Sequence, residues 1–288
     1  MLRLRTRGKQ RDRKTLQGQV AVVTGASRGL GSFIAEALAA AGADLVLTAR
    51  TAEALEEVAG RARDYGSEVL VVPGDISTPE TRQKLVEEAT STFGHVDILI
   101  NNAGLFETAA FCDLSPDTID SILGVNVGAM LHLTHAFLPG MLERKRGNIV
   151  NLASLAGRVG PAYSTVYAAT KGAEIAATHS LHATYRDSGV KFTVVCPGFV
   201  SDTGMWHDQA MSRGVKTSRL VGSSSPQAVV AAVFKAIEKG PVEILVNTPP
   251  MRPLLVIGEI SPRFRHFVLR MMGVNRAFKR TAELSEDR

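Results

Sequence analysis

Two side chains of this sequence suit proton transfer, Tyr167 and Lys171, and Ser154 lies thirteen positions upstream of the tyrosine. Tyr167 and Lys171 lie four positions apart, and residues at that spacing share one face of a helix. A fixed cation beside a phenol favours the phenolate and lowers the tyrosine pKa, so the phenol can serve as a general acid–base near neutral pH. The spacing alone is weak, because tyrosine and lysine fall four apart on many helices by chance. The significance of the Tyr167/Lys171 spacing therefore depends on the motifs elsewhere in the sequence.

A glycine-rich turn lies upstream, between a predicted strand and a predicted helix. Residues 19–24 form a nearly continuous apolar run, as buried parallel strands require, and the sequence Gly-Ala-Ser-Arg-Gly-Leu-Gly follows at 25–31. Glycines permit a tight turn and close backbone approach, and the N-terminus of the next helix offers N–H groups to a pyrophosphate. The alternative is an ordinary turn with incidental glycines. The strand–turn–helix context favours a dinucleotide site.

Strand and helix patterns alternate from Val20 to Val246 with no polar linker. Strands are predicted at 19–24, 44–49, 68–73, 97–101, 147–153, 191–196 and 242–246, and a long helix that Ser115 caps is predicted at 115–141. This pattern predicts an α/β fold, a Rossmann-type doubly wound sheet of seven parallel strands with helices on both faces. We expect one dinucleotide-binding and catalytic domain at 18–250, a basic disordered arm at 1–17 and a basic amphipathic extension at 251–288.

Several candidate residues follow directly after predicted strands. In doubly wound sheets ligands bind beyond the carboxyl ends of the strands, so residues at those ends are expected at one edge. The residues in question are Gly25, Arg50, Asp75, Asn102, Ser154 and Pro197.

Composition and charge exclude several classes of protein. The net charge is +5, but residues 1–14 and 252–280 each carry seven Lys/Arg and one acid, so the body between them is acidic. That distribution does not suit a nucleic-acid-binding face. Two cysteines give no disulfide framework and fit a reducing compartment, and the seven histidines show no metal-ligand spacing, so we expect no metal.

One segment has the length and composition of a membrane span. Residues 121–142 contain no Asp, Glu, Lys or Arg. They do contain Asn126, His132, His135 and Pro139, which a lipid-facing helix would hold at substantial cost. A helix of a soluble protein is the better interpretation.

The motifs occur together in the order and spacing of one known family. They are TGASRGLG at 24–31, NNAG at 101–104, VNVG at 125–128, Ser154, the Tyr167/Lys171 pair and Pro197-Gly198. Over about residues 18–205 the chain resembles the classical short-chain dehydrogenases/reductases (SDR). The resemblance implies an oxidoreductase that interconverts a carbonyl and a secondary alcohol with a nicotinamide cofactor. It implies catalysis by Asn126, Ser154, Tyr167 and Lys171, and cofactor binding by Gly25, Ser27, Arg28, Gly29, Leu30, Gly31, Arg50, Asp75, Ile76, Asn102, Ala103, Gly104, Tyr167, Lys171, Pro197, Gly198, Val200 and Thr203.

The resemblance also implies a role for each catalytic residue. Tyr167 exchanges a proton with the substrate oxygen, and Ser154 holds that oxygen. Lys171 binds the nicotinamide ribose and keeps the phenol acidic. Asn126 positions a water that links Lys171 to solvent. Relatives usually carry a threonine two residues beyond Val200; here Thr203 stands one place later, so either the loop bulges or Thr203 does not contact the nicotinamide.

The second predicted strand indicates which nicotinamide cofactor binds. An acid at its end accepts a hydrogen bond from the 2′-hydroxyl of NAD but repels the 2′-phosphate of NADP. This chain has Ala49 there, followed by Arg50, and Arg28 lies inside the glycine turn. Guanidinium groups suit a phosphate, so we expect NADP(H) rather than NAD(H).

The substrate side is less specified. A substrate loop is expected at about 201–225, with Met205, Trp206, His207 and Met211, and Phe106, Leu155 and Val159 are expected on the opposite wall. Such apolar residues suit a hydrophobic carbonyl or alcohol, or they cap the core. The extension at 251–288 either packs over the pocket or another subunit, which we favour slightly, or contacts an anionic membrane surface.

Rival readings come from other functional classes. A catalytically silent dinucleotide-binding scaffold or redox sensor is disfavoured because all four catalytic residues are present. An epimerase or dehydratase is disfavoured by the short substrate region and the glycine spacing. The expected protein is cytoplasmic, in contact at most with the periphery of a membrane, and a homodimer or homotetramer that binds no nucleic acid.

Overall fold

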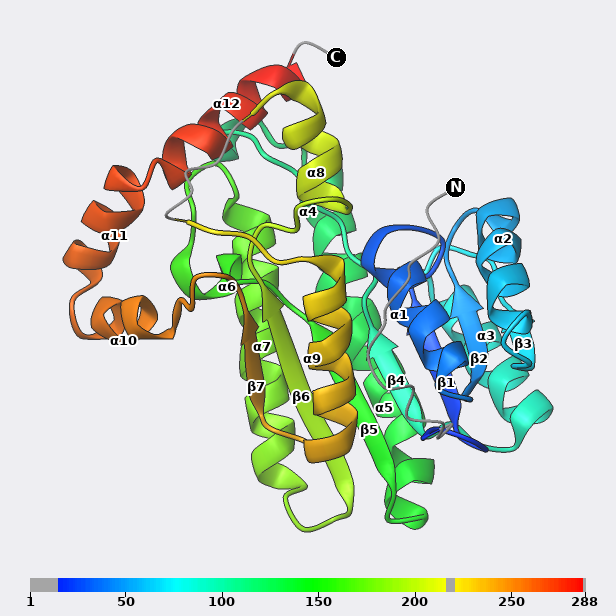
Figure 1. Cartoon of the computed structure of the whole chain (residues 1–288). Coiled ribbons are helices and arrows are strands. Elements are labelled where there is room, and N and C mark those ends of the chain that lie inside the picture. The colour runs from blue at the N-terminus through cyan, green and yellow to red at the C-terminus, as the bar shows by residue number, and fades with distance from the viewer. Residues whose placement is uncertain (1–14, 216–220, 287–288) are drawn as a thin grey trace, which may run out of the picture.

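The computed structural model describes residues 15–215 and 221–286 (Figure 1). At its centre lies one sheet of seven parallel strands in the order β3-β2-β1-β4-β5-β6-β7. The fold class predicted from sequence is therefore confirmed. The strands are β1 (Val20–Thr24), β2 (Asp44–Thr48), β3 (Val69–Val71), β4 (Ile98–Asn101), β5 (Gly147–Leu152), β6 (Val190–Pro197) and β7 (Glu243–Val246).

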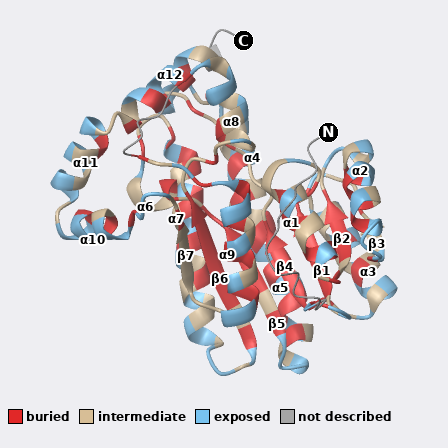
Figure 2. Ribbon diagram, viewed as in Figure 1, coloured by how far each residue is buried: buried red, intermediate tan, exposed pale blue. Residues whose placement is uncertain are grey.

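Helices cover both faces of the sheet (Figure 2). Strand β1 shows the consequence for sequence: Ala21 and Val23 pack into one apolar core, and Val20 and Val22 pack into the other. A strand buried on both faces needs apolar residues at every position. Helices α1 (Gly29–Ala40), α2 (Ala52–Arg63) and α9 (Pro226–Lys239) pack on the first core, and α3 (Pro79–Phe93), α5 (Ala129–Glu143) and α7 (Thr165–Thr184) pack on the second.

The long helix expected at 115–141 forms with a change of geometry in the middle. It begins as α4 (Pro116–Leu123), continues through a π-helical turn (Gly124–Gly128) and proceeds as α5. The side chain of Ser115 accepts a hydrogen bond from the N–H of Thr118 at 3.1 Å, which confirms the predicted cap. By length and composition Pro116–Glu143 could cross a membrane, but Leu133, Phe137 and Met141 are buried against the sheet. It is a core helix of this fold.

The N-terminal boundary of the folded domain differs from the expected one. Leu16 is buried and donates its N–H to the carbonyl of Ala41 at 2.9 Å, so residues 15–17 belong to the folded body and not to a disordered arm. Residues 1–14 lie outside the described residues. Strand β3 is shorter than predicted, and its three residues are partly buried at the edge of the sheet.

The substrate loop and the extension are helical where they are described. The loop contains α8 (Met205–Gln209) and a 3-10 turn (Met211–Arg213), and its residues 216–220 lie outside the described part. The extension forms α10 (Arg252–Ile260), α11 (Pro262–Met271) and α12 (Val274–Glu286). Short helical turns also occur at Phe111–Asp113 and, as α6, at Ala156–Val159.

Candidate active site

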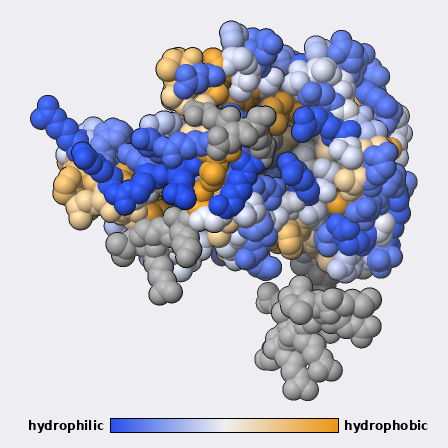
Figure 3. Space-filling model, turned by 90° about the horizontal axis from the view of Figure 1, so that it is seen from above, coloured by the Kyte–Doolittle hydropathy of each residue, from blue (hydrophilic) through white to orange (hydrophobic). Residues whose placement is uncertain are grey.

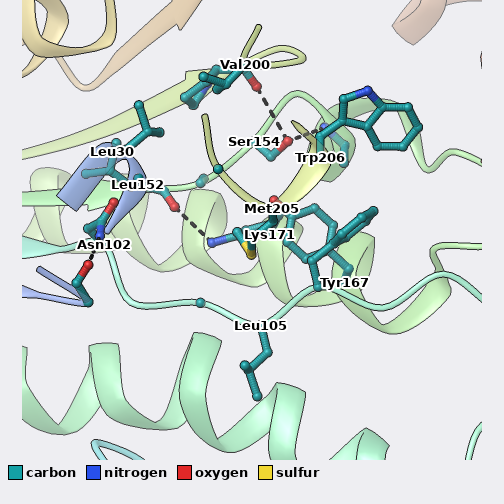
Figure 4. A pocket seen from close by; sticks show the side chains of 18 of the residues that line it. Leu30, Asn102, Leu105, Leu152, Ser154, Tyr167, Lys171, Val200, Met205 and Trp206 are labelled. Carbon is teal, nitrogen blue, oxygen red and sulfur yellow. Dashed lines mark hydrogen bonds between the residues drawn. The ribbon is translucent and has the colours of Figure 1, made fainter. Parts of the chain in front are cut away.

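A cavity of about 880 Å³ runs along the carboxyl edge of the sheet. Its walls come from the glycine turn, the loops after β2, β3, β4, β5 and β6, helices α7 and α8 and the C-terminal helices. Figure 4 shows the part of the cavity around Ser154, Tyr167 and Lys171. The six residues expected at the strand ends all line it. Of the other site residues predicted from sequence, all line the cavity except Gly31 and Asn126.

The glycine turn has the shape that the sequence predicted. Gly25 adopts φ +65°, and a Cβ there would lie 2.9 Å from the Cα of Ala103. A Cβ on Gly31 would collide with the carbonyl oxygen of Gly25, so α1 can approach β1 this closely only with glycine at that position. Arg28 at the N-cap of α1 forms no side-chain cap, which leaves the N–H groups of the first turn for a ligand.

Asn102 and Thr24 hold this turn from behind. The amide of Asn102 donates to the carbonyls of Thr24 and Gly25 at 2.9 and 3.2 Å. The hydroxyl of Thr24 accepts from the N–H groups of Asn102 and Ala103 at 3.0 and 2.9 Å. The NNAG motif therefore fixes the turn as well as lining the cavity, because it ties the end of β4 to the end of β1.

Tyr167 and Lys171 lie on α7 and are both buried, with side-chain positions on the cavity wall. The Nζ atom of Lys171 lies 5.6 Å from the centre of the Tyr167 ring. It donates to the carbonyl of Leu152 at 2.9 Å and to Oε1 of Glu174 at 2.8 Å. The predicted pair is thus assembled, and the ammonium is held in place by two buried oxygens.

Burial changes the acidity of this pair. It raises the pKa of the Tyr167 phenol, and the charge of Lys171 opposes the shift without cancelling it. The sequence-based prediction of a lowered tyrosine pKa is therefore wrong for this state of the site, because desolvation outweighs the attraction to the lysine. Burial also works to lower the pKa of Lys171, but the Glu174 carboxylate and the phenol outweigh it, and the net pKa is raised. The lysine is a stable cation.

Glu174 was not found by the sequence analysis. Its side chain is buried, and burial raises its pKa to about 7 although the Lys171 ammonium opposes the shift. The available signal was its position three residues after Lys171, which places both side chains on one helix face. A glutamate at that spacing is common on exposed helices, so sequence alone did not distinguish a buried partner from a solvated one.

Ser154 lies just beyond β5, beside the phenol. Its hydroxyl lies close enough to the phenol to oppose the rise in the pKa of Tyr167. It also accepts from the N–H of Ala156 at 3.1 Å and donates to the carbonyl of Pro197 at 3.5 Å. These contacts fix the hydroxyl between the ends of β5 and β6, at the cavity surface.

Asn126 is buried in the π-helical turn and does not line the main cavity. Its Oδ1 accepts from the N–H of Leu105 at 2.7 Å, and its Nδ2 donates to the carbonyl of Leu105 at 3.0 Å and to the hydroxyl of Thr170 at 2.9 Å. Both ends of the amide therefore bind protein. The side chain ties the loop after β4 to α7 one residue before Lys171, and the extra residue of the π turn brings it there.

The far end of the cavity carries the two arginines. Arg50 is exposed and lies near enough to Asp75 to help lower the pKa of that carboxyl, after the stronger hydrogen bonds from Ser77. Arg28 pairs with Asp208 of α8 at 3.2 Å between exposed atoms. Thr203, displaced by one position relative to the family pattern, still lines the cavity close to Gly29.

Aromatic side chains form the other end. The ring of Phe106 packs edge-on against that of Tyr167, with 4.8 Å between the ring centres. The ring centre of Phe278, in α12, lies 4.8 Å from that of Trp206 and 6.2 Å from that of Phe106. Leu155 and Val159 also line this wall, as predicted, whereas Met211 is exposed and does not. The extension thus completes the apolar wall, which agrees with the packing that we favoured for it.

This site fits a nicotinamide dinucleotide. One cavity joins an uncapped helix N-terminus, where backbone N–H groups suit a pyrophosphate, to the buried Tyr167/Lys171 pair. Within residues 15–215 and 221–286 no group of three or more His, Cys, Asp or Glu side chains could hold a metal ion.

Comparison with known proteins also indicates a protein that binds a nicotinamide dinucleotide. Residues 19–213 match the family model described as short chain dehydrogenase. The chain is 38% identical over 265 residues to the ketoacyl reductase HetN of Nostoc sp. (strain PCC 7120), which covers 90% of this chain and 91% of that protein. It is 36% identical over 239 residues to an uncharacterized oxidoreductase of Staphylococcus aureus (strain USA300), covering 83% of this chain and 99% of that one.

Solved structures agree. A metagenomic short-chain oxidoreductase in complex with NADP matches with a TM-score of 0.69 and 30% identity over 81% of this chain and 97% of its own. L-Sorbose reductase from Gluconobacter frateurii, in complex with NADPH and L-sorbose, matches with a TM-score of 0.73 and 27% identity over the same shares. Relatives and structures both support binding of a nicotinamide dinucleotide and action on carbonyl or alcohol groups. The chain is an oxidoreductase of the short-chain dehydrogenase/reductase family.

Proposed function

We propose that this protein is an NADP(H)-dependent oxidoreductase that interconverts a carbonyl and a secondary alcohol on a hydrophobic substrate. The observation that supports it most is the continuity of the cavity, which joins the glycine turn to the buried Tyr167/Lys171 pair and then to an aromatic wall. The test is an NADPH-consumption screen over hydrophobic ketones and aldehydes, with NADH controls. A silent scaffold or redox sensor would bind the nucleotide and consume none with any of these compounds.

Each catalytic side chain has a distinct role in this proposal. A bound nicotinamide supplies or accepts the hydride. Tyr167 gives its phenolic proton to the substrate oxygen in reduction and takes it back in oxidation. Ser154 donates a hydrogen bond to the same oxygen, where negative charge develops. Lys171 stabilises the phenolate that remains, because its charge is fixed by Glu174 and Leu152.

Asn126 acts as a positioning residue here. Its amide fixes Leu105 and Thr170, and so the wall in front of the cofactor and the helix turn before Lys171. The water-binding role that the family resemblance implies for it stays a prediction. The carry-over of the remaining cofactor contacts, including Thr203 with the nicotinamide, is likewise part of the proposal and is supported by their places on the cavity wall.

Preference for NADP(H) over NAD(H) is supported by the loop after β2. Ala49 leaves no acid there, Arg50 lies at the cavity, and the N-cap residue of α2, Thr51, forms no side-chain cap. We expect Arg50→Ala to raise the KM for NADPH about tenfold and to leave the KM for NADH nearly unchanged, because a hydrogen bond to a charged group contributes about 1.5–3 kcal/mol. Steady-state kinetics with both cofactors measure this. Arg186→Ala, an exposed arginine outside the cavity, is the control, and an equal change for both cofactors would contradict the preference.

A hydrophobic substrate is supported by the aromatic wall. Phe278 is 4% exposed and contacts Trp206, Phe199 and Phe106. We expect Phe278→Ala to lower the free energy of unfolding by about 3 kcal/mol, because it leaves a cavity among buried rings. We also expect it to raise the KM for a bulky apolar ketone more than the KM for a small one. Denaturant titration and kinetics with the two ketones measure these effects, and equal changes in KM would remove Phe278 from the substrate wall.

Assembly and location complete the proposal. We infer a homodimer or homotetramer in the cytoplasm. Leu123 and Leu131 are each 44% exposed on the outer face of the α4–α5 helix, which suits a subunit interface. Cys112 and Cys196 are free thiols, as expected in a reducing compartment. Light scattering of the purified protein measures the assembly.

A further inference from the structure

Helices α10 and α11 form a pair that stands out from the body beside β7 (Figure 1). They cross closely at Gly258, where a Cβ would meet the side chain of Arg265 at 3.0–3.3 Å. Their inner side is apolar and buried: Leu255 and Leu269 are 8% and 3% exposed and line the catalytic cavity. The pair therefore belongs to the wall of the active site.

The outer side of the same pair is also apolar, but it is exposed to solvent (Figures 2 and 3). Six large apolar side chains are exposed within sixteen residues, and the six others exposed elsewhere in the described chain are scattered from Phe33 to Met211. A concentrated apolar patch of this kind marks an interaction surface. The six are Val256 (56%), Ile257 (48%), Ile260 (81%), Phe264 (43%), Phe267 (57%) and Met271 (72%), and we call them the outer patch.

The net charge around the outer patch is positive. Helices α10 and α11 contain four arginines and one acid, Glu259, which pairs with Arg265 at 3.2 Å. Arg263 and Arg270 are exposed beside the patch and form no ion pair with any residue of the described segments. Apolar side chains interspersed with arginines are the pattern of helices that lie in the interface of an anionic bilayer.

We propose that the outer patch docks on an anionic lipid bilayer. A carbonyl or alcohol dissolved in the lipid would then enter the catalytic cavity beside α10–α11, whose inner side lines it. A second copy of this chain is a poorer occupant, because a two-fold contact would bring the same unpaired arginines of both copies together. An anionic surface attracts them instead. The docking is inferred from the outer patch and its charge alone. That the substrate is dissolved in lipid rests on the proposed function.

Vesicle flotation of the full-length protein tests the docking. Phosphatidylcholine vesicles are compared with vesicles that also contain phosphatidylglycerol, at low and high salt. We expect binding to the anionic vesicles only, and release by salt. We expect Ile260→Ser/Phe264→Ser/Phe267→Ser to reduce binding at least tenfold, since it removes three apolar side chains that would enter the interface.

The matched control is Phe111→Ser, which removes a side chain with the same 57% exposure as Phe267 from a turn outside α10 and α11. It should bind like the parent, and all variants keep the basic residues 1–14, so any attraction by that segment is the same throughout. Binding by the triple variant equal to the parent, or equal binding to both vesicle types, overturns the proposal. Loss of self-association by the triple variant in sedimentation, with vesicle binding unchanged, assigns the patch to a second copy and also overturns it.

Turnover of a water-soluble ketone separates this proposal from the proposed function. It should be unchanged in the triple variant, because none of the three residues lines the cavity. Vesicle binding without turnover of any carbonyl by the parent would remove the oxidoreductase activity and leave the docking intact. Turnover of a carbonyl by the parent without vesicle binding would remove the docking and leave the oxidoreductase activity intact.

Discussion

Tyr167→Phe is expected to lower kcat by about 10³-fold, because the phenol is the only proposed proton donor to the substrate oxygen. The fold and the cofactor site should survive. The ring of Phe106 packs edge-on against residue 167 at 4.8 Å, and a phenylalanine keeps that contact. The measurements are single-turnover kinetics for the chemical step and fluorescence titration for NADPH binding.

Ser154→Ala gives the matched comparison for this variant. It removes the proposed hydrogen-bond donor to the substrate oxygen but leaves the phenol in place, so we expect a smaller loss of kcat than for Tyr167→Phe. Turnover by Tyr167→Phe at the parent's rate would exclude Tyr167 from the mechanism. Loss of NADPH binding in that variant would show that the effect is one of folding or binding and not of proton transfer.

Lys171→Met is expected to abolish measurable turnover and to destabilise the protein by about 3 kcal/mol at pH 9, because it leaves the Glu174 carboxylate buried without its partner. Adding Glu174→Leu should restore most of the stability, since two apolar side chains then replace a buried ion pair. It should restore no activity. Denaturant unfolding of the parent, the single variant and the double variant measures the coupling.

The pKa of Glu174 determines how the destabilisation by Lys171→Met should depend on pH. Burial raises the pKa of Glu174 in the folded protein to about 7, and removing Lys171 raises it further, because the ammonium opposes the shift. A carboxyl whose pKa is higher in the folded than in the unfolded state favours folding at low pH, and this contribution is lost as the pH rises through the folded-state pKa. The destabilisation by Lys171→Met should therefore be small at pH 5 and large at pH 9. A difference that is the same at both pH values, or that persists in the double variant, would contradict a buried carboxylate as its cause.

The sequence by itself determined the sheet, the glycine turn and the Tyr167/Lys171 pair. These features are local: an apolar strand buried on both faces, a glycine at φ +65°, and two residues on one helix face are each specified within a few positions. The order of parallel strands then places their carboxyl ends at one edge, so the convergence of Gly25, Asn102 and Ser154 followed from topology.

Only the tertiary structure decided the pKa values of the site and which distant residues complete its wall. The net effect on the pKa of Tyr167 depends on burial by Phe106 and its neighbours, which no spacing reveals. Phe278 contacts Phe106 although the two are more than a hundred residues apart in the sequence. Glu174 is a partner of Lys171 because both side chains are buried away from water. Desolvation and contacts between distant segments arise from packing, and packing is a property of the whole folded chain.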